Sequence, residues 1–208
     1  MASDIAIVDY GAGNLQSVAN GLKRIGYAGR ITSNPTEILE AQGVILPGVG
    51  SSGAAMDALE ERKLIAPLRK VAENGTPLFC VCIGLQLLFE ASEEDTRPCL
   101  GIIPGKVKRL PSENKVPHMG WNKVNLLNTH PVFEGIESGS YFYFVHSYYA
   151  KPDNNSLVLG ITSYSVSFCS VLASKNIIAT QFHPEKSGAV GLRLYENFIH
   201  NMVLEGAT

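Results

Sequence analysis

The chain has 208 residues, of which 45% are hydrophobic and 17% charged, and its net charge is −2 at pH 7. This length suits one domain over residues 1–208 with a full core, and the absence of any basic stripe argues against nucleic acid or anionic membrane as partners. No apolar run approaches the roughly 20 residues of a membrane span, and the start MASDIAIVDY lacks a signal-peptide pattern. The four cysteines form no C-x-x-C pair, so a reduced, cytoplasmic setting is expected.

The first half of the chain alternates strand-like and helix-like segments. Buried apolar runs of strand length lie at 4–9, 43–48 and 76–82. Apolar residues at helical spacing follow them at 14–26, 53–75 and 84–92. After the glycine-rich turn 10–13, Asn14 could cap its helix, and Pro67 either kinks or divides the long helix that contains it. This alternation predicts right-handed βαβ units and a parallel sheet.

The second half predicts an antiparallel addition to that sheet. Short strand-like runs separated by Gly, Pro and Asn lie at 106–110, 141–149, 156–164 and 168–174. A last strand at 176–182 precedes a closing helix at 187–206, on whose polar side His200 falls. The predicted fold class is therefore α/β: an open, mostly parallel twisted sheet flanked by helices, with antiparallel strands added.

Two cysteines lie where the strand 76–82 turns into a helix. A nucleophile elbow at such a turn needs small residues two positions before and two positions after the nucleophile. Cys82 has Cys80 and Gly84 there, whereas Cys80 has the large Leu78 before it. A thiol at a helix N-terminus is also stabilised as thiolate, and the first free N–H groups can bind an oxyanion. Cys82 is thus the candidate nucleophile, the alternative being two inert core cysteines of about equal weight.

A base and its orienting group are available at the end of the last strand. His183 and Glu185 flank Pro184, and the carboxyl end of this strand lies at the same sheet edge as Cys82. A nucleophilic thiol needs both groups. The turn 47–50 (PGVG) follows another strand at this edge, and its glycines allow backbone N–H groups to point outward. H-P-E and P-G-x-G are weak signals separately, since either can be an ordinary loop, but together they predict a catalytic triad.

Taken together these residues resemble the triad glutamine amidotransferases, which carry a G-x-C-x-G nucleophile turn, H-P-E and a glycine-rich oxyanion turn. The closer resemblance is to the glutaminase subunits of imidazole glycerol phosphate synthase. It rests on the stretches IVDYGAGNLQSV, PGVG, SEEDTRPCLGIIPGKVKRL, PHMGWN, YFVHSYY and QFHPEKSG and extends from Ala6 to Phe198. The chain departs from the family pattern at Cys80 and Ser165, where glycine is usual, and at Ser51-Ser52, where a bulky residue is usual.

The resemblance implies hydrolysis of L-glutamine to glutamate and ammonia by a Cys82–His183–Glu185 triad. It places the oxyanion hole at the backbone N–H groups of Val49 and Ile83. The residues implied to hold glutamine are Gly48, Gly50, Gln86, His146, Ser147 and Tyr148. No cofactor is implied, and His118 and His146 lack metal-ligand spacing, so no metal site is expected. His130 is interpreted as structural.

The implied partner is a cyclase subunit with a (β/α)₈ barrel, which receives the ammonia in a heterodimer and switches on glutamine hydrolysis. Candidate docking residues are Asn14, His118, Met119, Trp121, Asn122, Tyr143 and Lys186. Two purely structural interpretations compete with docking: Trp121 could be core, and the aromatic run 141–149 could be a buried strand. The rival functions are another triad amidotransferase or a related cysteine hydrolase, and an interaction module with a degraded site.

Overall fold

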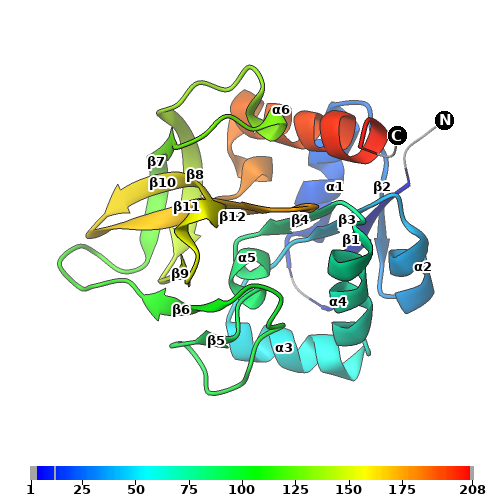
Figure 1. Cartoon of the computed structure of the whole chain (residues 1–208), viewed down its shortest axis with the longest axis horizontal. Coiled ribbons are helices and arrows are strands. Elements are labelled where there is room, and N and C mark those ends of the chain that lie inside the picture. The colour runs from blue at the N-terminus through cyan, green and yellow to red at the C-terminus, as the bar shows by residue number, and fades with distance from the viewer. Residues whose placement is uncertain (1–3, 12, 207–208) are drawn as a thin grey trace.

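A 12-stranded sheet runs through the computed structural model, which describes residues 4–11 and 13–206 (Figure 1). Ala12, part of the turn predicted at 10–13, lies outside the described residues. The strands are β1 (Ile5–Val8), β2 (Gly29–Thr32), β3 (Gly43–Leu46), β4 (Leu78–Val81), β5 (Ala91–Ser92), β6 (Gly105–Arg109), β7 (His118–Leu126), β8 (Ser140–His146), β9 (Tyr148–Pro152), β10 (Val158–Tyr164), β11 (Val166–Ser174) and β12 (Ile177–Thr180).

The sheet is parallel in one half and antiparallel in the other. Its main path is β2-β1-β3-β4-β12-β11-β10-β7-β8. The strands from β2 to β12 pair in parallel, and those from β12 to β8 pair antiparallel. Off this path, β9 pairs with β11 and β6, and β6 pairs with β5. The predicted fold class, a mostly parallel sheet with an antiparallel addition, is confirmed.

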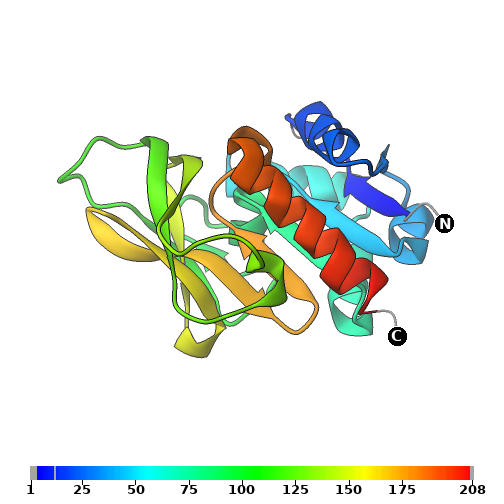
Figure 2. The same ribbon diagram turned by 90° about the horizontal axis from the view of Figure 1, so that it is seen from above.

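Helices cover both faces of the parallel half (Figures 1 and 2). They are α1 (Leu15–Arg24), α2 (Pro35–Glu40), α3 (Ser52–Glu61), α4 (Ile65–Asn74), α5 (Ile83–Leu87) and α6 (Gly188–Asn197). Side chains alternate along β1, so Ile5 and Ile7 pack with α1 and α6, while Ala6 and Val8 pack with α3 and α4. These two apolar layers hold the central strands, and with them the carboxyl ends where the predicted site residues lie.

The long helix predicted over 53–75 is two helices, and the break does not lie at Pro67. The chain leaves α3 after Glu61, and Lys63 adopts a left-handed conformation with φ 57°. Pro67 is the third residue of α4, where a helix N–H has no intrahelical partner to lose. The segment β2–α2 and the strand β7 had no predicted counterpart in the sequence. After α6 the chain continues as a π-helical turn, Phe198–Leu204.

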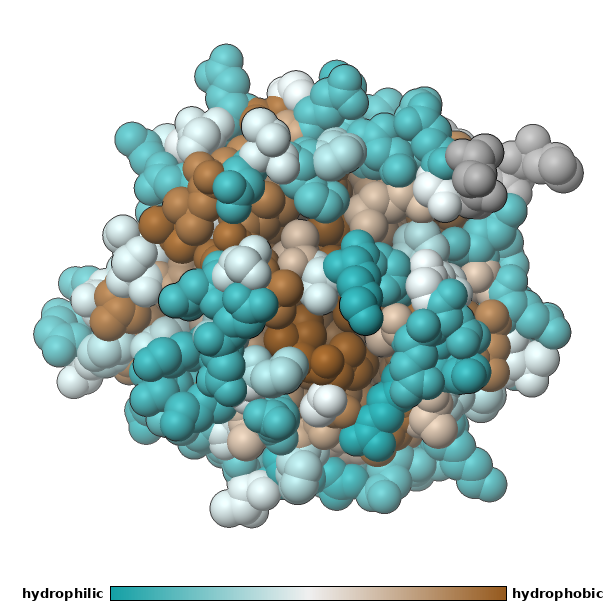
Figure 3. Space-filling view, in the orientation of Figure 1, coloured by the Kyte–Doolittle hydropathy of each residue, from teal (hydrophilic) through white to brown (hydrophobic). Residues whose placement is uncertain are grey.

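The surface is mostly hydrophilic, with apolar patches. In the view of Figure 3, hydrophobic residues gather near the middle of the face and beside β7 and β10. Over the described residues, no helix is long and apolar enough to cross a membrane. The large apolar side chains that stay exposed include Met119 and Trp121 on β7 and Tyr141 on β8. The antiparallel half therefore carries the most exposed aromatic surface.

Candidate active site

Cys82 occupies a strained turn between β4 and α5. Its backbone has φ 55° and ψ −106°, a region that residues with a side chain rarely adopt, and α5 begins at the next residue, Ile83. A Cβ on Gly84 would overlap the backbone oxygen of Leu46, so this position requires glycine. Cys80 is fully buried in β4 and leaves the turn intact. The chain thus forms the elbow that the sequence predicts, with cysteine in place of the usual glycine at residue 80.

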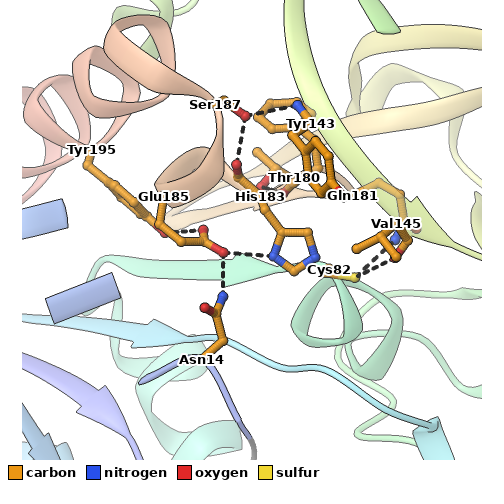
Figure 4. A network of polar contacts seen from close by, with 11 residues as sticks. Asn14, Cys82, Tyr143, Val145, Thr180, Gln181, His183, Glu185, Ser187 and Tyr195 are labelled. Carbon is orange, nitrogen blue, oxygen red and sulfur yellow. Dashed lines mark hydrogen bonds and ion pairs between the residues drawn. The ribbon is translucent and has the colours of Figure 1, made fainter. Parts of the chain in front are cut away.

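His183 and Glu185 lie beside Cys82 because β12 pairs directly with β4. His183 Nδ1 is 2.8 Å from Glu185 Oε1, and both side chains are buried (Figure 4). The opposite ring atom, His183 Nε2, is on the side of Cys82 and has no hydrogen-bond partner among the described residues. A histidine that donates from Nδ1 to a carboxylate presents a basic Nε2. In space, the three side chains therefore lie in the order thiol, imidazole base and carboxylate.

Charge, more than burial, sets the ionisation of His183. Burial by itself lowers the pKa of His183, but its electrostatic interaction with Cys82 and the hydrogen bond that it donates to Glu185 raise this pKa to about 10. Burial likewise raises the pKa of Glu185, and the bond with His183 outweighs this and lowers it. The Cys80 thiol has no such partner, and burial raises its pKa far above the usual range. The site favours an imidazolium next to a carboxylate, and it leaves Cys80 as an inert thiol.

Two further residues hold Glu185, and sequence reasoning missed this role for both. Asn14 Nδ2 donates to Glu185 Oε1 at 2.5 Å, and Tyr195 Oη donates to Oε2 at 3.3 Å (Figure 4). Asn14 adopts a left-handed conformation with φ 76° and makes no side-chain cap to α1. The prediction that Asn14 caps this helix is wrong, because its amide is engaged by the carboxylate. Its place at the end of the turn that follows β1, at the same sheet edge, was the available signal.

A cavity of about 310 Å³ opens in front of Cys82. Its lining includes these predicted site residues: Val49, Gly50, Cys82, Ile83, Gln86, His146, Ser147, Tyr148 and His183. Gly48 and Glu185 are not in the lining; Glu185 lies behind His183, and a Cβ on Gly48 would overlap the Tyr10 hydroxyl. Three further lining residues were not predicted, namely Glu94, Pro117 and Val145. The cavity thus joins the parallel edge to the start of β9.

Glu94 lines the cavity and binds the first residue of α3, just after the turn 47–50. Its Oε2 accepts from the backbone N–H of Ser52 at 2.7 Å, while Ser51 accepts from Ala54 N–H and caps α3. Gly50 has φ 98°, which glycine adopts without strain. Ser51, unusual for the family pattern, therefore caps α3 with its hydroxyl, while residue 52 binds Glu94 through its backbone N–H. Glu94 lies after β5 in an irregular segment, so no periodicity marked it.

Comparison with known proteins identifies the family. Residues 6–202 match the family model described as glutamine amidotransferase class-I. The chain is 51% identical over 195 residues to an imidazole glycerol phosphate synthase subunit HisH from Dehalococcoides mccartyi, covering 93% of this chain and 95% of that protein. A subunit of the same name from Moorella thermoacetica is 50% identical, covering 93% of each. The chain belongs to the class-I glutamine amidotransferases and, within them, to the HisH family.

Solved structures share this fold at low sequence identity. One described as a glutamine amidotransferase superposes with a TM-score of 0.74 at 20% identity, covering 94% of this chain and 97% of that one. PurLQS from Thermotoga maritima gives 0.77 at 18% identity, covering 97% and 99%. At such identities these likenesses support the fold, and the HisH relatives carry the family assignment.

The docking residues predicted for a HisH family member fall into two groups. Met119 and Trp121 are 63% and 55% exposed, so Trp121 is not core, and Trp121 packs on Tyr143 with ring centroids 6.2 Å apart. Lys186 lies above the Tyr143 ring, 5.9 Å from its centre. His118, in contrast, is 3% exposed and turned inward. In the described part of the chain no group of three His, Cys, Asp or Glu side chains could hold a metal ion.

Proposed function

We propose that this chain hydrolyses L-glutamine through Cys82, His183 and Glu185 and passes the ammonia to the cyclase subunit of imidazole glycerol phosphate synthase. The observation that carries this proposal is the buried Glu185–His183 pair, whose free Nε2 faces Cys82 at the strained elbow. His183 takes the thiol proton while Glu185 orients the ring and balances the imidazolium charge. The Cys82 thiolate then attacks the side-chain amide carbon of glutamine.

Backbone N–H groups stabilise the oxyanion that forms in this step. Ile83 is the first residue of α5, where N–H groups have no intrahelical acceptor, and Val49 lines the cavity opposite. His183 then protonates the leaving ammonia, and water hydrolyses the Cys82 thioester to glutamate. The carboxylate of Glu94 suits the α-ammonium group of glutamine. Gln86 Oε1, buried in the lining without a partner among the described residues, accepts from the ligand.

The exposed aromatic face of β7 and β8 is the proposed docking surface for the cyclase barrel. Met119, Trp121, Tyr143 and Lys186 lie there, and aromatic residues and methionine are enriched at protein interfaces. The same strands reach the cavity, because Val145 and His146 of β8 line it. Ammonia must pass directly between two sites, since in neutral water it is mostly ammonium, which is not a nucleophile.

Glutamate release in the presence of the barrel subunit tests this function. The chain is mixed with that subunit, its ribonucleotide substrate and glutamine, and wild type is compared with Cys82→Ala and Cys80→Ala. We expect Cys82→Ala to abolish release and Cys80→Ala to retain most of it, because burial makes Cys80 inert. Unchanged turnover in Cys82→Ala would overturn the assignment.

Two further comparisons test the proposed partner. Glutamine hydrolysis without the barrel should be much slower, and equal rates would refute gating by the partner. Trp121→Ala should weaken stimulation by the barrel more than Leu127→Ala, a control with 50% exposure at the end of β7. Equal effects of the two substitutions would remove Trp121 from the docking surface.

A further inference from the structure

A continuous set of hydrogen bonds runs from β7 to the catalytic sulfur. It starts at Asn122, whose Nδ2 lies 3.2 Å from His118 Nε2 on the same strand. His118 Nδ1 lies 3.0 Å from Nε2 of His146, the residue directly opposite it on β8. His146 Nδ1 in turn lies 2.8 Å from the backbone oxygen of Tyr148. These contacts lead from a half-buried surface residue to the wall of the glutamine cavity.

The amide of Asn122 gives this chain of bonds its direction. Its Oδ1 accepts from the backbone N–H of Lys123 at 2.8 Å, and one Nδ2 hydrogen is donated to the Ser163 carbonyl at 3.1 Å. A flipped amide would set an oxygen against the Ser163 carbonyl oxygen, which is repulsive. The amide nitrogen therefore faces His118 and donates to it.

Both histidine tautomers follow from that donation. His118 accepts at Nε2, so in its neutral form it carries its hydrogen on Nδ1 and donates to His146. His146 then accepts at Nε2 and donates from Nδ1 to the Tyr148 carbonyl, an acceptor that fits a donor alone. The two ends of the chain of bonds agree, since each fixes the same tautomers independently. The imidazoles are 3% and 6% exposed, and burial keeps them neutral by lowering the pKa of His118 to about 4 and that of His146 to about 3.

The Tyr148 carbonyl carries the connection onward to Cys82. It also accepts from Gln86 Nε2 at 2.9 Å, and the second hydrogen of this amide is donated to Gln181 Oε1 at 3.1 Å. Gln181 Nε2 lies 3.7 Å from the Cys82 sulfur (Figure 4). The glutamine amides are buried, and the Tyr148 carbonyl, which accepts from both His146 and Gln86, joins the two parts of the chain of bonds. Gln86 Oε1 is left free, facing the cavity.

We propose that His118 and Asn122 are positioning residues that fix the glutamine-binding wall through this directed chain of bonds. They touch no substrate atom; they hold the Tyr148 carbonyl and, through it, the Gln86 amide. This role rests on the proposed glutaminase function. The rings of Phe144 and Tyr164 stack on His118 with centroids 4.9 and 4.0 Å away, so its surroundings are apolar. Hydrophobic side chains in place of His118 and His146 would cost less desolvation than two imidazoles. We therefore interpret the two buried histidines as groups that position the glutamine-binding wall.

Asn122→Ala tests the proposal, with Tyr164→Phe as the matched control. The control keeps the ring stacked on His118 and loses the hydroxyl bond to the Lys115 carbonyl, which is outside the chain of bonds. In the complex with saturating barrel subunit, we expect Asn122→Ala to raise the KM for glutamine about fivefold to tenfold and to change kcat by less than about twofold. Ring ¹⁵N NMR of the wild-type chain should show the hydrogen on Nδ1 in both His118 and His146.

The results of these measurements separate a failure of the positioning role from a failure of the proposed glutaminase function. A hydrogen on Nε2 of either histidine in wild type, or a KM of Asn122→Ala equal to that of Tyr164→Phe, overturns the positioning role. A lower thermal stability with unchanged KM assigns the pair to structure alone and also overturns it. If wild type with the barrel releases no glutamate, the proposed glutaminase function fails first, and the positioning role falls with it.

Discussion

His183 and the pair His118 and His146 are all buried near Cys82, but His183 favours the charged form and the pair stays neutral. Burial acts to lower the pKa of all three histidines. The pKa of His118 falls to about 4 and that of His146 to about 3, yet the pKa of His183 is raised to about 10. The difference lies in their partners. Next to His183 are the Cys82 sulfur and the Glu185 carboxylate, whereas the pair bonds to neutral groups. Burial alone therefore does not set a histidine's charge; an ionised neighbour reverses it.

Replacing the carboxylate at Glu185 should erase this difference and have the largest effect. In Glu185→Gln the ring loses its anion and the tautomer that leaves Nε2 basic. We expect kcat for barrel-stimulated glutamine hydrolysis to fall by about 10³- to 10⁴-fold, with little change in folding. Steady-state kinetics measure this, and Tyr195→Phe, which removes the weaker bond to Oε2, is the control. A fall of less than tenfold would contradict the assigned role of Glu185.

Acidification should affect the neutral pair. The unfolded chain protonates histidine near pH 6.5, but the folded pair resists protonation until the pH nears 4 or below. Between these values the unfolded state binds more protons, so stability falls as the pH falls, by up to about 1.4 kcal/mol per pH unit for each histidine. Chemical denaturation from pH 7 to 4 measures the slope. His118→Phe should flatten it and His200→Gln, at an exposed site, should not; equal slopes would contradict the prediction.

Removing Asn14 should produce a smaller change on the charged side. Asn14→Ala takes away the donor at 2.5 Å from Glu185 Oε1, one of the contacts that lower the pKa of this carboxyl. We expect kcat to fall about tenfold, and the acidic limb of the pH–rate profile to move to higher pH. Asn20→Ala, which breaks an exposed bond with Gln16 on the same helix, is the control. An unmoved acidic limb would show that Asn14 does not act through Glu185.

The sequence predicted the local features that depend on short-range patterns. The apolar run before Cys82, the small residues around it and the order of strands and helices predict the elbow and the sheet edge. The parallel sheet also predicts that His183 and Cys82 lie at one edge, whereas the direct pairing of β12 with β4 is seen only in the structure. Each of the predicted features depends on chain chemistry within a few residues or on the sheet rules for carboxyl ends.

Contacts between distant segments escaped prediction. The Asn14 amide could cap α1 or bind a carboxylate 171 residues away, and no local pattern chooses between them. Glu94 lies in an irregular segment, and β7 alternates polar residues with few apolar ones, so neither has a strong periodic signal. The long helix breaks at Lys63, which adopts φ 57° although its sequence gives no glycine or proline there. Tertiary packing decides such positions.

The place of β12 has a consequence for synthesis of the chain. This strand comes last in sequence among the strands, but it lies between β4 and β11 and joins the two halves of the sheet. Until the ribosome has released residues 177–180, β4 and β11 both present unpaired edges, which other chains can bind. The same late segment brings His183 and Glu185. A product truncated before β12 would therefore expose two aggregation-prone strand edges and would also lack His183 and Glu185.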